Sequence, residues 1–212
     1  RGLGDVYKRQ HEIYLAGGCF WGTEAYLKKL PGIIDTEVGY ANANVENPSY
    51  EDVCTGTTNA AEAVKVTYDA DVISLPLLLQ AYLRTIDPFS LNRQGNDMGT
   101  QYRTGIYWTD PADSHAAESL LMELARNTGK QPRVEAAPLL NFYPAEGYHQ
   151  DYLGKNPFGY CHVNLADANA FIAEHGLTVL MDVVRSLPPL DTPYVPRDSI
   201  VREFVGGSIF QY

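Results

Sequence analysis

Cysteine is scarce in this chain of 212 residues, which holds only Cys19, Cys54 and Cys161. An odd number of widely spaced cysteines does not build the disulfide framework of a small secreted domain. The sequence also lacks CxxC and HxxxH pairs, so it has no structural zinc spacing, and it lacks glycine-rich phosphate loops. These absences favour a reducing compartment. We expect a cytoplasmic protein without a metal, in which any disulfide is transient and catalytic.

Basic charge is also in short supply. The chain has 16 Lys and Arg residues against 26 Asp and Glu residues, which gives a formal net charge of -10. A nucleic acid or an anionic membrane would require a basic face, so we expect neither partner. No apolar run approaches the roughly 18 residues of a membrane span. Residues 1–10 show neither the apolar core of a signal peptide nor a periodic pattern, and we interpret them as a non-native leader.

Strand and helix patterns alternate along residues 11–175, which predicts one α/β domain with a mixed sheet. Residues 176–212 differ from this domain because they carry several prolines, and we interpret them as an extension of unassigned role. Strands are predicted over 11–16, 33–40, 61–68, 101–109 and 134–142, and helices over 19–30, 74–83, 110–127, around 150 and over 166–175.

The most informative segment places Cys19 between the first predicted strand and the first predicted helix. Gly18 and Gly22 lie on either side of it, and Phe20 and Trp21 follow it directly. Unpaired amide groups at a helix N-terminus favour a thiolate, which is the nucleophilic form of cysteine. The alternative, a small buried structural cysteine, has less need of the glycines.

Glu62 is the second candidate catalytic residue. Residues 61–68 alternate as a strand, which places Glu62 on the same apolar face as Val64 and Val66. Burial disfavours the charged carboxylate, so we expect a raised pKa and a general acid near neutral pH. The alternative is a glutamate at the strand end that bends back into solvent.

Other candidates depend on their proximity to Cys19. The hydroxyls of Tyr50 and Tyr102 could bind a polar oxygen, although each tyrosine taken alone is more typical of packing. Cys161 lies in a loop containing glycine and proline, where it could act as a mobile resolving thiol or remain inert. His149 could serve as a base, but we favour a role in orienting a helix. The segment around Cys54 shows no helix start, and we expect an ordinary buried thiol there.

The segment Gly18–Gly22, with the sequence GCFWG, resembles the active-site signature of the A-type peptide methionine sulfoxide reductases. The resemblance continues in order over about residues 12–163. It is carried by Gly39–Tyr40, Asn47–Tyr50, Val53–Gly56, Ala61–Val64, Arg93–Asp97, Gly99–Arg103, Glu146, His149–Gln150, Tyr152–Leu153 and Asn156–Cys161.

The resemblance implies a two-layer α+β sandwich with a ferredoxin-like mixed sheet and flanking helices. It also implies reduction of methionine S-sulfoxide, free or in proteins, by a monomer that needs no metal or organic cofactor. By motif, Cys19 would attack the sulfoxide sulfur while Glu62 protonates the oxygen. Tyr50 and Tyr102 would hydrogen-bond that oxygen.

The resemblance further implies how substrate is held and how the thiol is restored. Phe20 and Trp21 would form an apolar pocket for the methyl group, and Asp97 would shape it. Cys161 would then condense with the sulfenic acid left on the nucleophilic cysteine. Thioredoxin would reduce the resulting disulfide.

Two positions depart from the family pattern. Ala60 and Met98 stand where the family usually has histidine, and no cysteine follows Cys161 as a further recycling thiol.

Two other classes of protein remain open. A cysteine hydrolase would pair Cys19 with His149, but it would need an ionised imidazole partner. A binding module that has lost turnover would have no use for a nucleophile.

Overall fold

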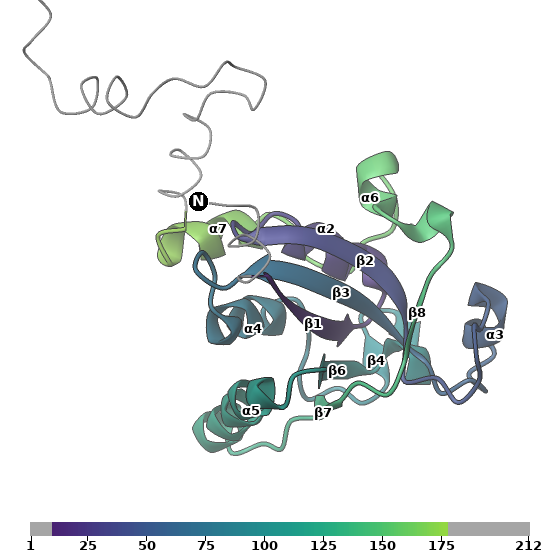
Figure 1. The fold of residues 1–212 in the computed structure, drawn as a ribbon, viewed down its shortest axis with the longest axis horizontal. Coiled ribbons are helices and arrows are strands. Elements are labelled where there is room, and N and C mark those ends of the chain that lie inside the picture. The colour runs from purple at the N-terminus through teal and green to yellow at the C-terminus, as the bar shows by residue number, and fades with distance from the viewer. Residues whose placement is uncertain (1–9, 178–212) are drawn as a thin grey trace, which may run out of the picture. The chain divides into compact units, whose positions relative to one another are not determined.

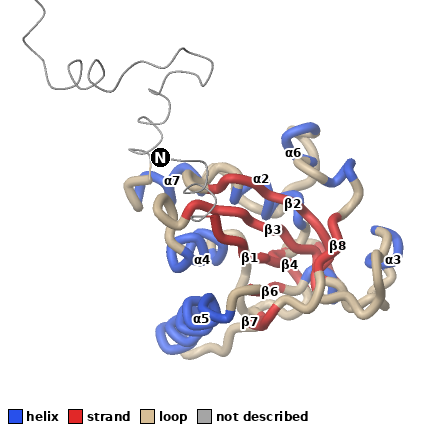
Figure 2. Tube along the Cα trace, in the orientation of Figure 1, coloured by secondary structure: helices blue, strands red, loops and turns tan. Residues whose placement is uncertain are grey.

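The computed structural model has a six-stranded mixed sheet with helices packed against it. Figures 1 and 2 show this arrangement of strands and helices. The structure describes residues 10–177. The predicted leader, apart from its last residue, and the predicted extension beyond residue 177 lie outside the described residues. The first strand begins at Gln10, one residue before the predicted start of the domain, and the predicted boundaries stay predictions.

The sheet has the strand order β7-β6-β1-β3-β2-β8. The pair β6 and β7 is parallel, whereas the other neighbouring strands are antiparallel, so the predicted mixed sheet is confirmed. A separate two-stranded ribbon, β4 and β5, lies between the predicted helix 74–83 and the predicted strand 101–109, where the sequence predicts neither helix nor strand. The strands are β1 Gln10–Gly17, β2 Ile33–Ala41, β3 Ala61–Asp69, β4 Arg93–Gln94, β5 Asp97–Met98, β6 Thr104–Trp108, β7 Glu135–Pro138 and β8 Phe142–Pro144.

The helices begin where the sequence supplies suitable caps. The Ser74 side chain accepts a hydrogen bond from the Leu77 amide at the start of α4, and Asp110 caps the 3-10 turn that leads into α5. The helices are α2 Phe20–Leu27, α3 Tyr50–Cys54, α4 Leu75–Leu83, α5 Ser114–Thr128, α6 Tyr152–Lys155 and α7 Asp167–Glu174, with 3-10 turns at Thr100–Tyr102, Pro111–Asp113 and Gly147–His149.

The two faces of the sheet are covered differently, which gives the expected two-layer sandwich. One face carries the main core, where strand residues such as Ile13, Leu15 and Val64 pack with residues of α2, α4, α5 and α7. The opposite face is lined mostly by alanine and tyrosine, and Leu139 and Phe142 pack against it. Small side chains on this second face allow a non-helical segment to cover it.

Three predicted elements differ in the structure. The predicted strand 134–142 is two strands at opposite edges of the sheet, because Pro138 cannot donate to a ladder and the chain crosses the second face after it. Tyr102 lies in a 3-10 turn after Gly99, whose φ of 146° bends the chain before β6 begins. Cys54 ends a short helix that Ser49 and Asp52 begin as a capping box, although the sequence predicts no helix there.

The site lies where β1 ends and β3 begins. These strands are antiparallel, with Leu15 opposite Val64, so the end of β1 lies beside the start of β3. Gly18 turns the chain from β1 into α2 with a φ of 82°. A Cβ atom there would come within 2.6 Å of the Gln94 Cβ, so only glycine fits this turn.

Candidate active site

Cys19 is the N-cap residue of α2, as the sequence predicts, and its side chain is 7% exposed. The expected thiolate is not what the structure favours, because burial raises the pKa of Cys19 well above its ordinary value. The charge of Glu62 raises this pKa further, and a hydrogen bond from the Trp21 amide opposes the shift. Desolvation therefore outweighs the helix N-terminus, and the resting thiol keeps its proton.

Glu62 lies near the start of β3 and is 2% exposed, so the predicted burial is confirmed. Its Oε1 is 3.5 Å from the amide nitrogen of Phe20, the residue that follows Cys19. Burial raises the pKa of Glu62 to about 8, against the lowering effect of that amide. The predicted raised pKa is confirmed, and at neutral pH the site combines a neutral thiol with a neutral carboxylic acid.

Tyr50 and Tyr102 reach the same region from α3 and from the turn before β6. Burial raises the pKa of both tyrosines well above the ordinary value, and the charge of Glu62 raises both further. Cys19 also contributes to the shift at Tyr102, so both hydroxyls remain protonated donors. The Tyr50 hydroxyl is hydrogen-bonded to Cys54.

Cys54 itself is exposed at the end of α3, which makes the expectation of a buried thiol wrong. Cys54 lies one helical turn after Tyr50 and is hydrogen-bonded to it, so this thiol lies at the rim of the site.

The indole of Trp21 is held by two contacts. Its Nε1 donates a hydrogen bond of 3.0 Å to Nδ1 of His149, and its ring stacks on Tyr152 with 3.7 Å between the ring centroids. Phe20 is 1% exposed and packs near the rings of Tyr40 and His149. His149 therefore orients the indole of the predicted substrate-binding tryptophan, beyond its predicted role at a helix.

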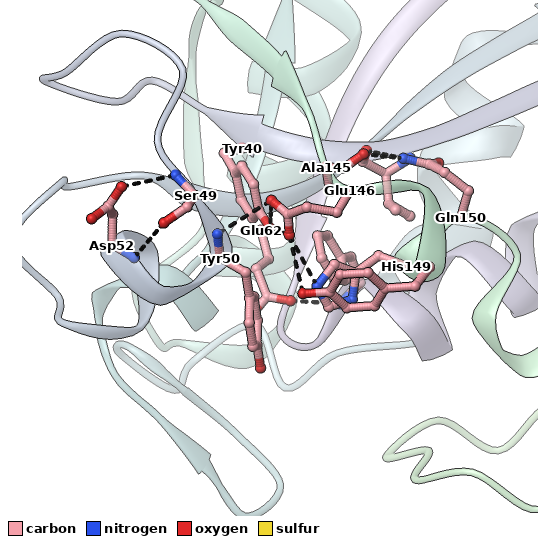
Figure 3. A network of polar contacts seen from close by, with 12 residues as sticks. Tyr40, Ser49, Tyr50, Asp52, Glu62, Ala145, Glu146, His149 and Gln150 are labelled. Atoms are coloured by element: carbon pink, nitrogen blue, oxygen red, sulfur yellow. Dashed lines mark hydrogen bonds and ion pairs between the residues drawn. The ribbon is translucent and has the colours of Figure 1, made fainter.

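Glu146 joins this aromatic cluster to Tyr50, as Figure 3 shows. Its carboxylate accepts hydrogen bonds from the Tyr40 hydroxyl and the Tyr50 amide, and its Oε2 lies 3.4 Å from Nε2 of His149. One carboxylate thus supports both Tyr50 at the start of α3 and the histidine that holds Trp21.

Cys161 packs against the first turns of α2. A Cβ atom on Gly22 would lie 3.1 Å from the Cys161 sulfur, so glycine leaves room for this thiol. The sulfur donates to the Val163 carbonyl oxygen over 3.2 Å, and the charge of Cys161 contributes to the pKa shift of Cys19. Both thiols are free.

Asp97 lies in β5 and accepts a 2.9 Å hydrogen bond from the hydroxyl of Tyr160, the residue before Cys161. Its charge raises the pKa of Glu62 and of Tyr102. The structure therefore brings all eight predicted site residues into one region: Cys19, Phe20, Trp21, Tyr50, Glu62, Asp97, Tyr102 and Cys161.

Comparison with known proteins identifies the family. The family model described as peptide methionine sulfoxide reductase matches residues 11–177. The chain belongs to the peptide methionine sulfoxide reductase family. The predicted family and enzyme class are thereby confirmed, and the protein is an oxidoreductase that reduces peptide methionine sulfoxide.

Curated relatives and solved structures agree with this family. Peptide methionine sulfoxide reductase MsrA of Mycoplasma genitalium is 54% identical over 152 residues, which cover 72% of this chain and 97% of the relative. The enzyme of the same name from Clostridium perfringens strain ATCC 13124 is 53% identical over 154 residues, covering 73% and 98%. Reduced Mxr1 from Saccharomyces cerevisiae has a TM-score of 0.70 at 39% identity, covering 74% of this chain and 92% of that one. Methionine sulfoxide reductase A of Corynebacterium diphtheriae has a TM-score of 0.65 at 37% identity, covering 72% and 78%.

The geometry does not place His149 as the partner of Cys19 that a cysteine hydrolase would need. Nδ1 of His149 accepts from Trp21, and its Nε2 faces Glu146, so both ring nitrogens point to partners other than Cys19. No helix within residues 10–177 has the length and apolar character needed to cross a membrane.

The two departures from the family pattern lie in different surroundings. Ala60 is 1% exposed and belongs to the main core, whereas Met98 is 67% exposed on β5.

The sequence analysis assigned no role to three residues around the site. Glu146 links Tyr50 to His149, Gln94 packs against Gly18, and His162 follows Cys161 with its ring against the end of β1. Glu146 and Gln94 lie in motifs that carry the family resemblance, but their roles depend on contacts that are distant in sequence, and His162 had only its position beside a candidate thiol as a signal.

Proposed function

We propose that this reductase acts on the S epimer of methionine sulfoxide, free or in proteins, through Cys19, Glu62 and Cys161. The observation that carries the proposal is the neutral acid–thiol pair, in which Glu62 is buried behind the amide that follows Cys19. A sulfoxide needs both groups, because its sulfur must be attacked while its oxygen gains protons.

In the first step, the Cys19 sulfur attacks the sulfoxide sulfur. Glu62 donates its proton to the sulfoxide oxygen and receives the thiol proton, so the two neutral groups act together. The net change breaks the bond between substrate sulfur and oxygen. Methionine leaves reduced, and Cys19 is oxidised to a sulfenic acid that carries the oxygen. Protonated Tyr50 and Tyr102 donate to the same oxygen as its charge develops.

Substrate placement relies on the aromatic side of the site. Trp21, held by His149 and stacked on Tyr152, is half-buried and presents the apolar surface for the methyl group, with Phe20 packed behind it. Asp97 shapes the opposite side through its hydrogen bond with Tyr160.

In the second step, Cys161 attacks the sulfenic sulfur of Cys19, and a disulfide and one water molecule form. The packing of Cys161 on Gly22 supports this assignment, since it keeps the second thiol close to α2. A dithiol protein such as thioredoxin then reduces the disulfide, and the chain acts as a cytoplasmic monomer without a metal or organic cofactor.

The test is reduction of the separate S and R epimers of a methionine sulfoxide derivative with dithiothreitol, by the wild type and by Cys19→Ser. We expect turnover of the S epimer alone and its loss in the variant. Turnover of the R epimer, or near wild-type activity of Cys19→Ser, would contradict the mechanism. Circular dichroism of both proteins would show that any lost activity belongs to a folded chain.

A further inference from the structure

The ring of His162, the residue after Cys161, lies against the end of β1. Its Nε2 is 3.0 Å from the carbonyl oxygen of Gly17. A carbonyl oxygen can only accept, so Nε2 carries the hydrogen in this contact. In the neutral ring, the lone pair therefore lies on Nδ1.

Nδ1 of His162 is buried and has no hydrogen-bond partner within residues 10–177. Burial lowers the pKa of His162 below its ordinary value of 6.5, although the Gly17 carbonyl and the charge of Asp97 oppose the shift. The ring is consequently neutral at pH 7, with a free acceptor inside the protein. A buried acceptor without a partner is costly, which indicates a use for it.

The free Nδ1 and the Cys161 thiol face the same place on α2. A Cβ atom on Gly22 would lie 3.1 Å from the Cys161 sulfur and 3.4 Å from Nδ1 of His162. Because Gly22 has no side chain, the thiol and the imidazole can both approach the backbone of α2 at this point. The Cys161 thiol donates its hydrogen to the Val163 carbonyl oxygen, and a base must take this proton for the sulfur to attack as a thiolate.

We propose that His162 is the base that takes the thiol proton of Cys161 when this cysteine attacks the sulfenic acid on Cys19. The inference rests on the proposed function, in which Cys161 is the resolving thiol. The bond between the two sulfurs forms, and the bond between the Cys19 sulfur and its hydroxyl oxygen breaks. The thiol proton passes to Nδ1, and the imidazolium returns it to the departing hydroxyl, which leaves as water.

The surroundings of His162 suit a transient imidazolium. Asp97 is the charged group that acts on His162, and its negative charge favours the protonated ring. The Tyr160 hydroxyl and the Cys161 thiol are further titratable groups near the ring. The hydrogen bond to Gly17 holds the ring in place throughout, since Nε2 keeps its hydrogen in both protonation states.

His162→Gln removes the proposed base, Nδ1, while it keeps the hydrogen bond that Nε2 makes to Gly17. A glutamine amide reaches the position of Nε2 and can still donate to Gly17, but it offers no acceptor at the position of Nδ1. His115→Gln, on the exposed surface of α5, is the matched control for the substitution. Each reduced full-length protein is mixed with one equivalent of methionine S-sulfoxide without reductant. Methionine is measured by quenched chromatography, and the disulfide by alkylation and mass spectrometry.

We expect His162→Gln to form methionine within about twofold of the wild-type rate and the disulfide about 10²-fold more slowly, as for loss of a general base. Equal disulfide rates in His162→Gln and wild type would overturn the proposal. Methionine formation by Cys19→Ser, or disulfide formation by Cys161→Ser, would instead contradict the proposed function. Both outcomes can be told apart from equal disulfide rates in His162→Gln and wild type, which contradict only the role of His162.

A pH profile of the wild type tests the base without any substitution. If His162 accepts the proton, the rate of disulfide formation levels off above the pKa of His162, and so is constant between pH 7 and 8. If free thiolate carries the step, the rate rises about tenfold over that interval. The second result would refute the assignment of His162 even if the glutamine variant failed to fold.

Discussion

The raised pKa of Glu62 makes the first chemical step depend on pH in a direction that its surroundings set. With a pKa of about 8, the carboxyl is about 90% protonated at pH 7 and about 10% protonated at pH 9. A carboxyl with the ordinary pKa of 4.5 would be only about 0.3% protonated at pH 7. Burial therefore increases the supply of acid at neutral pH by about 300-fold.

Because the neutral acid and the neutral thiol react together, the rate of methionine formation should be constant from pH 6 to 7 and fall about tenfold by pH 9. Glu62→Gln should remove this fall and lower the plateau by about 10²-fold, since the amide cannot donate an acidic proton. The assay is single-turnover methionine formation from reduced enzyme, so that neither disulfide formation nor the reductant limits the signal.

Two results would refute this reasoning. A wild-type rate that rises through pH 8 would mean that the thiolate of Cys19 carries the reaction in place of the neutral pair. A Glu62→Gln variant within a few-fold of wild type at pH 7 would mean that the oxygen is protonated by another group, with Tyr50 and Tyr102 as the nearest donors.

The same shift affects stability, which gives a measurement independent of turnover. The folded state binds the proton of Glu62 more tightly than the unfolded state, whose pKa is near 4.5. The free energy of unfolding should therefore fall as pH rises from about 5 to about 8. Glu62→Gln should lose this part of the pH dependence, as followed by urea unfolding at several pH values.

Three further predictions concern the second thiol and the core. Cys161→Ser should complete one round of methionine formation but lose cycling with thioredoxin, and unchanged steady-state rates would show that another thiol resolves the sulfenic acid. Gly22→Ala places a methyl group 3.1 Å from the Cys161 sulfur, so disulfide formation should slow about tenfold or more while methionine formation persists. Disulfide formation by this variant at the wild-type rate would refute the packing argument. The Tyr82 hydroxyl donates to the Ala16 carbonyl and accepts from the Gly105 amide. Tyr82→Phe should cost about 1–3 kcal/mol of unfolding free energy in urea, and a loss below about 0.5 kcal/mol would contradict that role.

The sequence predicts well where the physics is local. The alternation over residues 61–68 identifies β3 and the burial of Glu62, and Ser74 marks the start of α4. The sequence predicts secondary structure poorly where contacts between distant segments determine it. The stretch 134–142 divides between two edges of the sheet, and Tyr102 leaves the strand pattern because Gly99 bends the chain. The helix that ends at Cys54 was missed although its capping box is a local signal.

The sequence by itself determined the family, the strand–turn–helix setting of Cys19 and the buried acid on β3, because motif order and hydrophobic periodicity are properties of neighbouring residues. Only the tertiary structure decided the protonation state of the site. Cys19 stays a thiol because the core removes it from water and places Glu62 beside it, which outweighs the helix N-terminus that the sequence alone reveals. The tertiary structure also places Cys161 and His162 next to Gly22. Packing between residues about 140 positions apart cannot be read from local sequence patterns.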